Sequence, residues 1–254
     1  MCLILIAYDA HAEFPLVVVA NRDEYYQRPT ARAEFWQDHP HILAGRDLEC
    51  MGTWLGVTRA GRFAALTNFR DPSERKTDAP SRGHLVSDFL ASDQEPREYL
   101  GNVAIVAPRY NGFNLLAGDV DGVFYLSSRT RSVQLVPPGI HGLSNHLLDT
   151  PWPKVERGKQ RLKAALAGEF DVEALMDLLQ DREPATVGEL PDTGIGAEME
   201  RVLSPALIVS PQYGTRASTA VVFGEDGSVS FAERTILSGG STGPTVSLRF
   251  RLER

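Results

Sequence analysis

The hydrophobic positions of this chain fall into short runs that are separated by polar turns. The first two runs, 3–7 and 16–20, flank a polar segment at 9–13, and this pattern predicts an antiparallel hairpin. Symmetrical pairing places Cys2 opposite Asn21, within a residue or two. A thiol is therefore expected beside the cluster Asn21-Arg22-Asp23-Glu24, where the second run stops.

The remaining runs predict further hairpins and two helical regions. Asn111-Gly112 and Asp121-Gly122 are strong hairpin signals. Strands are expected at 54–58, 63–69, 103–106, 113–116, 123–126, 133–136, 141–145, 206–209, 220–223, 229–231 and 246–252. Helices are expected at 81–90, 96–100, 151–166 and 171–179, and irregular structure at 25–47 and 183–198.

The strand composition predicts a layered architecture. The runs 3–6, 16–19 and 206–209 are continuously apolar, which is typical of strands buried on both faces. Their tight connections require antiparallel pairing. We therefore expect a single α+β domain over 1–254, in which two sheets stack and the helical regions 81–100 and 151–180 lie outside.

Composition limits the functional classes. The net charge of −7 argues against a nucleic-acid partner, and no apolar run approaches the 18 residues of a transmembrane segment. The N-terminus lacks a secretory signal, and two cysteines, Cys2 and Cys50, are too few for a disulfide framework. These features favour a cytoplasmic protein and indicate no particular oligomeric state.

Cys2 offers a specific chemistry. Removal of Met1 is expected before so small a residue, and it would leave a thiol and a free α-amine on Cys2. Such an amine has a pKa of about 7.7–8.0 and can take the thiol proton, so one residue supplies both nucleophile and base. Arg22 would favour the thiolate, and Asp23 could hold the α-ammonium. The alternative is that Cys2 is a small buried hydrophobe of a core strand.

Several motifs carry a family resemblance over about 1–234. They are Met1-Cys2, Asn21-Arg22-Asp23-Glu24, Gly52-Thr53-Trp54-Leu55-Gly56, Thr67-Asn68-Phe69-Arg70, Ser81-Arg82-Gly83, Tyr110-Asn111-Gly112-Phe113-Asn114-Leu115, Leu143-Ser144-Asn145 and Tyr213-Gly214-Thr215-Arg216. They resemble the NRDE family, also called the transport and Golgi organisation protein 2 family. Met51 departs from it, because the family usually has glycine there, which puts close backbone packing at this position in doubt. The resemblance implies roles in Golgi organisation, lipid metabolism and haem mobilisation, and it brings no settled reaction.

A more distant resemblance is to the choloylglycine hydrolase and penicillin V acylase group. It implies a four-layer αββα sandwich of antiparallel sheets, the N-terminal-nucleophile hydrolase fold. Cys2 matches that group, and Asn145 fits its asparagine position. The Arg-x-x-Asp motif of its second strand is not matched, because Arg22 and Asp23 are adjacent and the spacing is held by Asn21 and Glu24.

These resemblances imply roles for named residues. Cys2 would attack, Arg22 and Asp23 would orient it, and Asn145 with backbone amides would bind the oxyanion. The substrate-binding candidates are Asn21, Glu24, Asn68 and Arg216, the last by bidentate pairing with a substrate carboxylate.

Two functions follow as hypotheses. The first is an amidohydrolase-like enzyme that acts on a small acyl amide or thioester and requires no cofactor. The alternative is a non-catalytic carrier that binds haem or an acyl-lipid in the same pocket. No metal site is predicted, since His39 and His41 flank a proline with no third ligand nearby, and no Cys-x-x-Cys-His haem motif is present.

Overall fold

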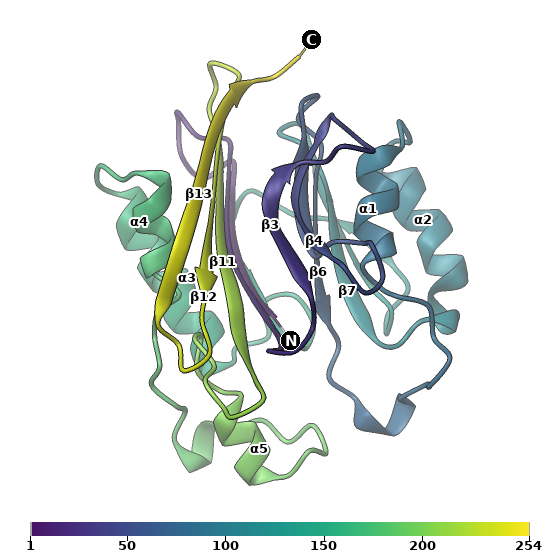
Figure 1. Ribbon diagram of the computed structural model, residues 1–254, viewed down its shortest axis with the longest axis vertical. Helices are drawn as coiled ribbons and strands as arrows, with labels where there is room; N and C mark the ends of the chain where they lie inside the picture. Colours follow the sequence, from purple (N-terminus) through teal and green to yellow (C-terminus); the bar gives the residue numbers. More distant parts are fainter. Residues whose placement is uncertain (1, 254) are drawn as a thin grey trace.

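The computed structural model describes residues 2–253, and Cys2 by its backbone alone. Two antiparallel sheets lie face to face, with helices on the outer side of each (Figure 1). Neighbouring strands of the first sheet are, in order, β10 (Gly139–Leu143), β1 (Cys2–Tyr8), β2 (Leu16–Tyr25), β11 (Tyr213–Phe223), β12 (Ser228–Ile236) and β13 (Thr242–Arg251). The four-layer αββα prediction is therefore confirmed.

The second sheet is a meander that follows chain order. Its strands are β3 (Thr30–Phe35), β4 (Ile42–Asp47), β5 (Leu55–Thr58), β6 (Phe63–Asn68), β7 (Phe113–Gly118), β8 (Val123–Ser127) and β9 (Val133–Leu135). Helices α1 (His84–Ala91) and α2 (Pro96–Val106) cover it, while α3 (Pro153–Leu166) and α4 (Val172–Asp177) cover the first sheet (Figure 1). The helix α5 (Ala197–Val202) and the 3-10 turns Pro72–Glu74, Ala107–Arg109 and Val187–Glu189 lie in the connections.

Both faces of each sheet are buried, which explains the continuous apolar runs. In β1, Ile4 and Ile6 pack between the sheets, where they join Val18, Phe63 and Phe231. Leu3 and Leu5 face the helices and pack with Val155 and Leu162 of α3. On the other side, Phe89 of α1 packs with Leu66 and Phe113. None of the helices within 2–253 has the length and apolar character that a membrane crossing needs.

Three predicted elements were wrong. Residues 103–106 continue α2 rather than forming a strand, because the buried Tyr99, Leu100 and Val103 recur at helical spacing. The segment 25–47, expected to be irregular, contains β3 and β4; β3 is an edge strand with Ala33 as its one buried position, so its apolar signal is weak. Residues 206–209 form a connection, and Val209 alone makes a bridge there, to Gly214.

The first hairpin forms with a register one residue from the symmetrical prediction. Cys2 pairs with Arg22, and Leu3 pairs with Asn21. A one-residue shift moves side chains to opposite faces of the sheet. By alternation along β2, Arg22 lies on the inter-sheet face with Val18 and Ala20, whereas Asn21 lies on the helix side; the observed register therefore pairs Cys2 with the residue on the inter-sheet face. The predicted contacts of the Cys2 side chain lie outside the described residues.

Met51 occupies a turn that explains the family preference for glycine. Its φ is +60°, in the left-handed region that L-residues enter at a cost. The Met51 side chain is half exposed, so it is the backbone conformation, rather than close packing, that favours glycine here.

Candidate functional site

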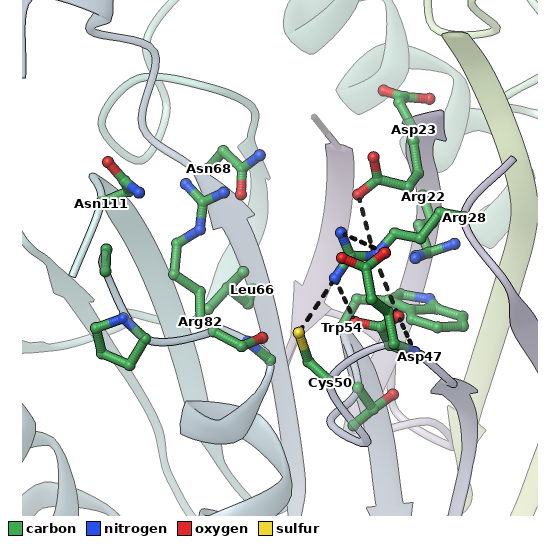
Figure 2. A pocket seen from close by; sticks show the side chains of 17 residues that line it. Arg22, Asp23, Arg28, Asp47, Cys50, Trp54, Leu66, Asn68, Arg82 and Asn111 are labelled. Carbon is green, nitrogen blue, oxygen red and sulfur yellow. Dashed lines mark hydrogen bonds and ion pairs between the residues drawn. The ribbon is translucent and has the colours of Figure 1, made fainter. Parts of the chain in front are cut away.

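A cavity of about 280 Å³ lies beside the end of β2, where loops of the second sheet approach the first (Figure 2). β2 contributes its last polar positions, β6 contributes Asn68, and the loop before α1 contributes Arg82. The lining residues are Arg22, Asp23, Glu24, Arg28, Asp47, Glu49, Cys50, Thr53, Trp54, Leu66, Asn68, Ala79, Pro80, Ser81, Arg82, Gly83 and Asn111. The lining is mainly polar, and several of its side chains are charged.

Arg22 lines this cavity and is held in place by contacts with Trp54 and Thr30. Its guanidinium lies 4.3 Å from the centre of the Trp54 ring, and Nη1 donates a hydrogen bond of 3.1 Å to Thr30 Oγ1. Because the backbone of Arg22 pairs with that of Cys2, the cavity adjoins the N-terminal end of β1.

Asp23 is buried and held by β11. Its Oδ1 accepts a hydrogen bond of 2.6 Å from Thr215 Oγ1, and its backbone carbonyl accepts one of 2.9 Å from the Tyr213 hydroxyl. Burial raises the pKa of the Asp23 carboxyl, and the charges of Lys154 and Arg70 act in the opposite direction. The Tyr213-Gly214-Thr215 part of the sequence motif therefore positions Asp23.

Arg28, Asp47 and Cys50 form a wall of the cavity that the sequence did not predict. Arg28 donates to Asp47 through Nε at 3.1 Å and Nη2 at 2.7 Å, and Nη2 is 3.6 Å from Cys50 Sγ. The hydrogen bond to Asp47 raises the pKa of Arg28. Burial alone would raise the pKa of Asp47, but the hydrogen bonds from Arg28 and from the Glu49 amide, together with the charges of Arg28 and Arg22, lower it overall. The sequence signal was hidden because Arg28 lies in the polar stretch that was assigned as irregular.

Asn145 lies next to the cavity but does not line it. Its carboxamide is fully buried: Nδ2 donates to the Asn68 carbonyl at 3.0 Å, and Oδ1 accepts from Arg70 Nη2 at 3.4 Å. The Asn68 side chain does line the cavity. The structure therefore places these two predicted residues in contact with each other.

The other predicted substrate contacts are divided between the cavity and the fold. Glu24 lines the cavity, and its Oε2 is 4.0 Å from Arg28 Nε. Asn21 lies away from the cavity, where Nδ2 donates to the carbonyls of Leu179 at 3.1 Å and Ala206 at 2.8 Å. Arg216 also lies outside the lining, and its Nη1 donates to the carbonyls of Tyr25 at 2.8 Å and Arg28 at 3.1 Å.

A buried carboxyl group supports the region below Arg22. Glu233 of β12 is 4 % exposed, and its Oε1 accepts a hydrogen bond of 2.8 Å from the Ala33 amide of β3. This bond links the two sheets. Burial raises the pKa of Glu233 to about 7, although the Ala33 bond and the charge of Arg22 oppose the shift.

The raised pKa of Glu233 predicts that stability falls as pH rises. Between about pH 4.5 and 7 the folded chain holds a proton that the unfolded chain has lost, so the free energy of unfolding decreases through this window and then levels off. Against Glu233→Gln, which keeps the acceptor for Ala33, the wild type should lose about 3 kcal/mol over that range. Urea unfolding of both proteins from pH 4.5 to 8 measures this, and a pH-independent difference between them would contradict it.

Comparison with known proteins shows which family the chain belongs to. The family described as Transport and Golgi organisation 2 matches residues 1–238. The chain belongs to this family. A Transport and Golgi organization protein 2 homolog of Bos taurus is 38 % identical and is covered over 100 % of both chains. The Homo sapiens homolog is 36 % identical, with 93 % of this chain and 94 % of that protein covered. The sequence-based family assignment is therefore confirmed.

A solved structure supports the fold of this Transport and Golgi organisation 2 member. The C2A mutant of conjugated bile acid hydrolase from Clostridium perfringens superposes with a TM-score of 0.52, over 98 % of this chain and 92 % of that one. The two chains share 8 % sequence identity, so the comparison shows a common N-terminal-nucleophile hydrolase fold and nothing finer.

Proposed function

We propose that this protein is a cysteine-dependent N-terminal-nucleophile hydrolase that cleaves a small acyl amide or thioester. The observation that carries the proposal is the pairing of Cys2 with Arg22, whose side chain lines a polar cavity. Removal of Met1 would expose the α-amine of Cys2 at this place. The fold shared with a bile acid hydrolase gives further support.

The proposed reaction has two halves. The α-amine takes the thiol proton, the sulfur attacks the carbonyl carbon, and the bond to the leaving amine or thiol breaks as that group receives the proton. Water, deprotonated by the same amine, then attacks the acyl-cysteine thioester; the C–S bond breaks, the acid is released, and the sulfur of Cys2 takes the proton back from the ammonium. Arg22 favours the thiolate. The negative charge of Asp23 stabilises the protonated α-amine of Cys2.

Asn145 is proposed as an oxyanion donor together with Asn68. The contact between the two residues holds Asn145 against the carbonyl of Asn68, whose own side chain lines the cavity. Fixed amide donors aimed at developing negative charge stabilise a tetrahedral intermediate more strongly than they stabilise the substrate. No cofactor takes part in this scheme.

The carrier hypothesis receives less support from the cavity. An apolar macrocycle or acyl chain binds mainly by burying apolar surface. Trp54 and Leu66 contribute apolar area, but most of the lining is charged or hydrogen-bonding. We therefore propose the hydrolase as the function of this cavity, in a cytoplasmic protein.

Turnover of a panel of N-acyl amides and acyl thioesters by the processed chain tests the proposal. We expect hydrolysis of at least one class, slowed by about 10²–10³ in Asn145→Ala because an oxyanion donor is lost. Alkylation of Cys2 by iodoacetamide should persist in that variant, since the nucleophile is intact. If no substrate is hydrolysed by the processed protein, the hydrolase proposal fails.

A further inference from the structure

Arg82 lies on the wall of the cavity that faces the Arg28–Asp47 wall. Figure 2 shows Asn68, Arg82 and Asn111 on one side of the cavity, and Arg22, Arg28 and Asp47 on the other. Arg82 Nη1 donates a hydrogen bond of 2.9 Å to the carbonyl of Gly112, in the loop before β7. This bond fixes the guanidinium at the cavity wall.

Charge is distributed unevenly between the two walls. The carboxylates of the lining, Asp23, Glu24, Asp47 and Glu49, come from the ends of β2 and β4 and from the turn after β4. Arg28 is bound to Asp47 on that side. The wall formed by Asn68, Arg82 and Asn111 contributes amides and one guanidinium to the lining. Arg22 also lies on the opposite side, but the four carboxylates there outnumber the guanidiniums of Arg22 and Arg28, so a negatively charged group is attracted more strongly to the wall of Asn68, Arg82 and Asn111.

We propose that Arg82 binds a carboxylate of the substrate and thereby selects acidic substrates. This inference rests on the hydrolase function proposed above and adds its substrate class. The planar guanidinium suits a carboxylate, which it can bind through two parallel N–H donors. The sequence had suggested Arg216 for this role, but its guanidinium holds the carbonyls of Tyr25 and Arg28 outside the cavity.

The size of the cavity limits the substrate further. The volume of about 280 Å³ lies just below the range of about 300–1,000 Å³ that is usual for ligand pockets. The carboxylate and the scissile carbonyl are therefore separated by a few methylene groups. The carboxylate belongs either to the acyl group, as in a dicarboxylic monoamide, or to the leaving group, as in an N-acyl amino acid.

Pairs of substrates that differ only in a carboxylate show whether it belongs to the acyl group or to the leaving group. Glutaryl-4-nitroanilide and valeryl-4-nitroanilide differ by a carboxylate on the acyl side. N-valeryl-4-aminobenzoate and N-valeryl-4-aminobenzamide differ by one on the leaving-group side. We expect the acidic member of at least one pair to have the higher kcat/KM.

Arg82→Gln should lower kcat/KM for the preferred acidic substrate by about 10- to 100-fold, the range for a charge-assisted hydrogen bond. The neutral member should change by less than about threefold, so the acid-to-neutral ratio is the readout that a purely structural role of Arg82 would not move. Arg82→Lys should restore part of the ratio. Arg97→Gln, at an exposed position of α2, is the control for loss of a surface arginine.

The outcomes separate this inference from the hydrolase proposal. Cys2-dependent hydrolysis with an acid-to-neutral ratio that Arg82→Gln leaves unchanged would overturn the role of Arg82 and leave the hydrolase standing. If no substrate is hydrolysed, calorimetric binding of glutaramate and neutral glutaramide to Cys2→Ala decides the inference. Preference for glutaramate that is lost in Cys2→Ala/Arg82→Gln supports it, and absence of any preference overturns it.

Discussion

A chain that keeps residues ahead of Cys2 is expected to lose turnover as completely as Cys2→Ala. In both proteins the same unit of nucleophile and base is lost: Cys2→Ala lacks the sulfur, and the extended chain turns the α-amine into an amide that cannot accept a proton. Loss of an enzyme nucleophile costs on the order of 10⁶ in kcat. Lysine inserted after Met1 should block methionine removal and give this result with the thiol still present.

The extended chain also provides its own control. An N-terminal extension that ends in a protease site is inactive as purified and becomes active when cleavage leaves Cys2 first. Intact mass follows the processing, and kcat follows the activity. Cys50 is the rival thiol, since it lines the cavity with Sγ 3.6 Å from Arg28 Nη2. Turnover that is lost in Cys50→Ala but retained by the extended chain would assign the chemistry to Cys50.

Glu200→Ala is expected to destabilise the protein by about 3–5 kcal/mol, because it leaves a buried guanidinium without its carboxylate. Glu200 of α5 is ion-paired with Arg70, and the two side chains are 2 % and 7 % exposed. Burial lowers the pKa of Arg70, and the charge of Glu200 opposes that effect. Glu200 Oε1 also accepts hydrogen bonds from Thr193, at 2.9 Å from the amide and 2.5 Å from the hydroxyl.

Glu200→Ala should also lower activity, because Arg70 contacts the proposed oxyanion donor Asn145. Arg70 Nη2 lies 3.4 Å from Asn145 Oδ1, so removal of the Glu200 carboxylate that holds Arg70 should also disturb the orientation of the proposed oxyanion donor. Urea unfolding measures the stability, and kcat of the folded fraction measures the second effect. Glu198→Ala, at an exposed position of the same helix, is the matched control and should change stability by less than about 0.5 kcal/mol. A Glu200→Ala protein as stable as that control would contradict this account of the pair.

Sequence predicted those parts of the fold that depend on local pattern. The first hairpin and the layered arrangement followed from apolar runs such as 3–6, where alternate residues pack against α3 and against the second sheet. β3 was missed because an edge strand with a single buried position carries little hydrophobic signal. Val103 was misassigned because a β-branched apolar run suits a strand until its helical neighbours are considered.

The site residues also fall into those that local sequence pattern could predict and those that it could not. Arg22 and Asp23 share a hairpin with Cys2, so their proximity could be predicted to within one residue of register. Arg28 and Arg82 come from loops and Asp47 from the end of β4; how close they lie depends on how the two sheets stack, and no spacing in the sequence encodes that. The sequence pattern also could not tell that Arg216 satisfies backbone carbonyls, because this depends on where the loop after β2 turns.

Trapping the covalent intermediate tests the Cys2 mechanism most directly. The processed chain is mixed with an acyl thioester it hydrolyses, quenched in acid within the first turnover, and analysed by intact mass and peptide mapping. The account predicts one added acyl group, carried by the sulfur of an N-terminal Cys2 and absent from Cys2→Ala and from the chain with retained Met1. An acyl group on Cys50, or rapid turnover with no acyl group on Cys2, would contradict it.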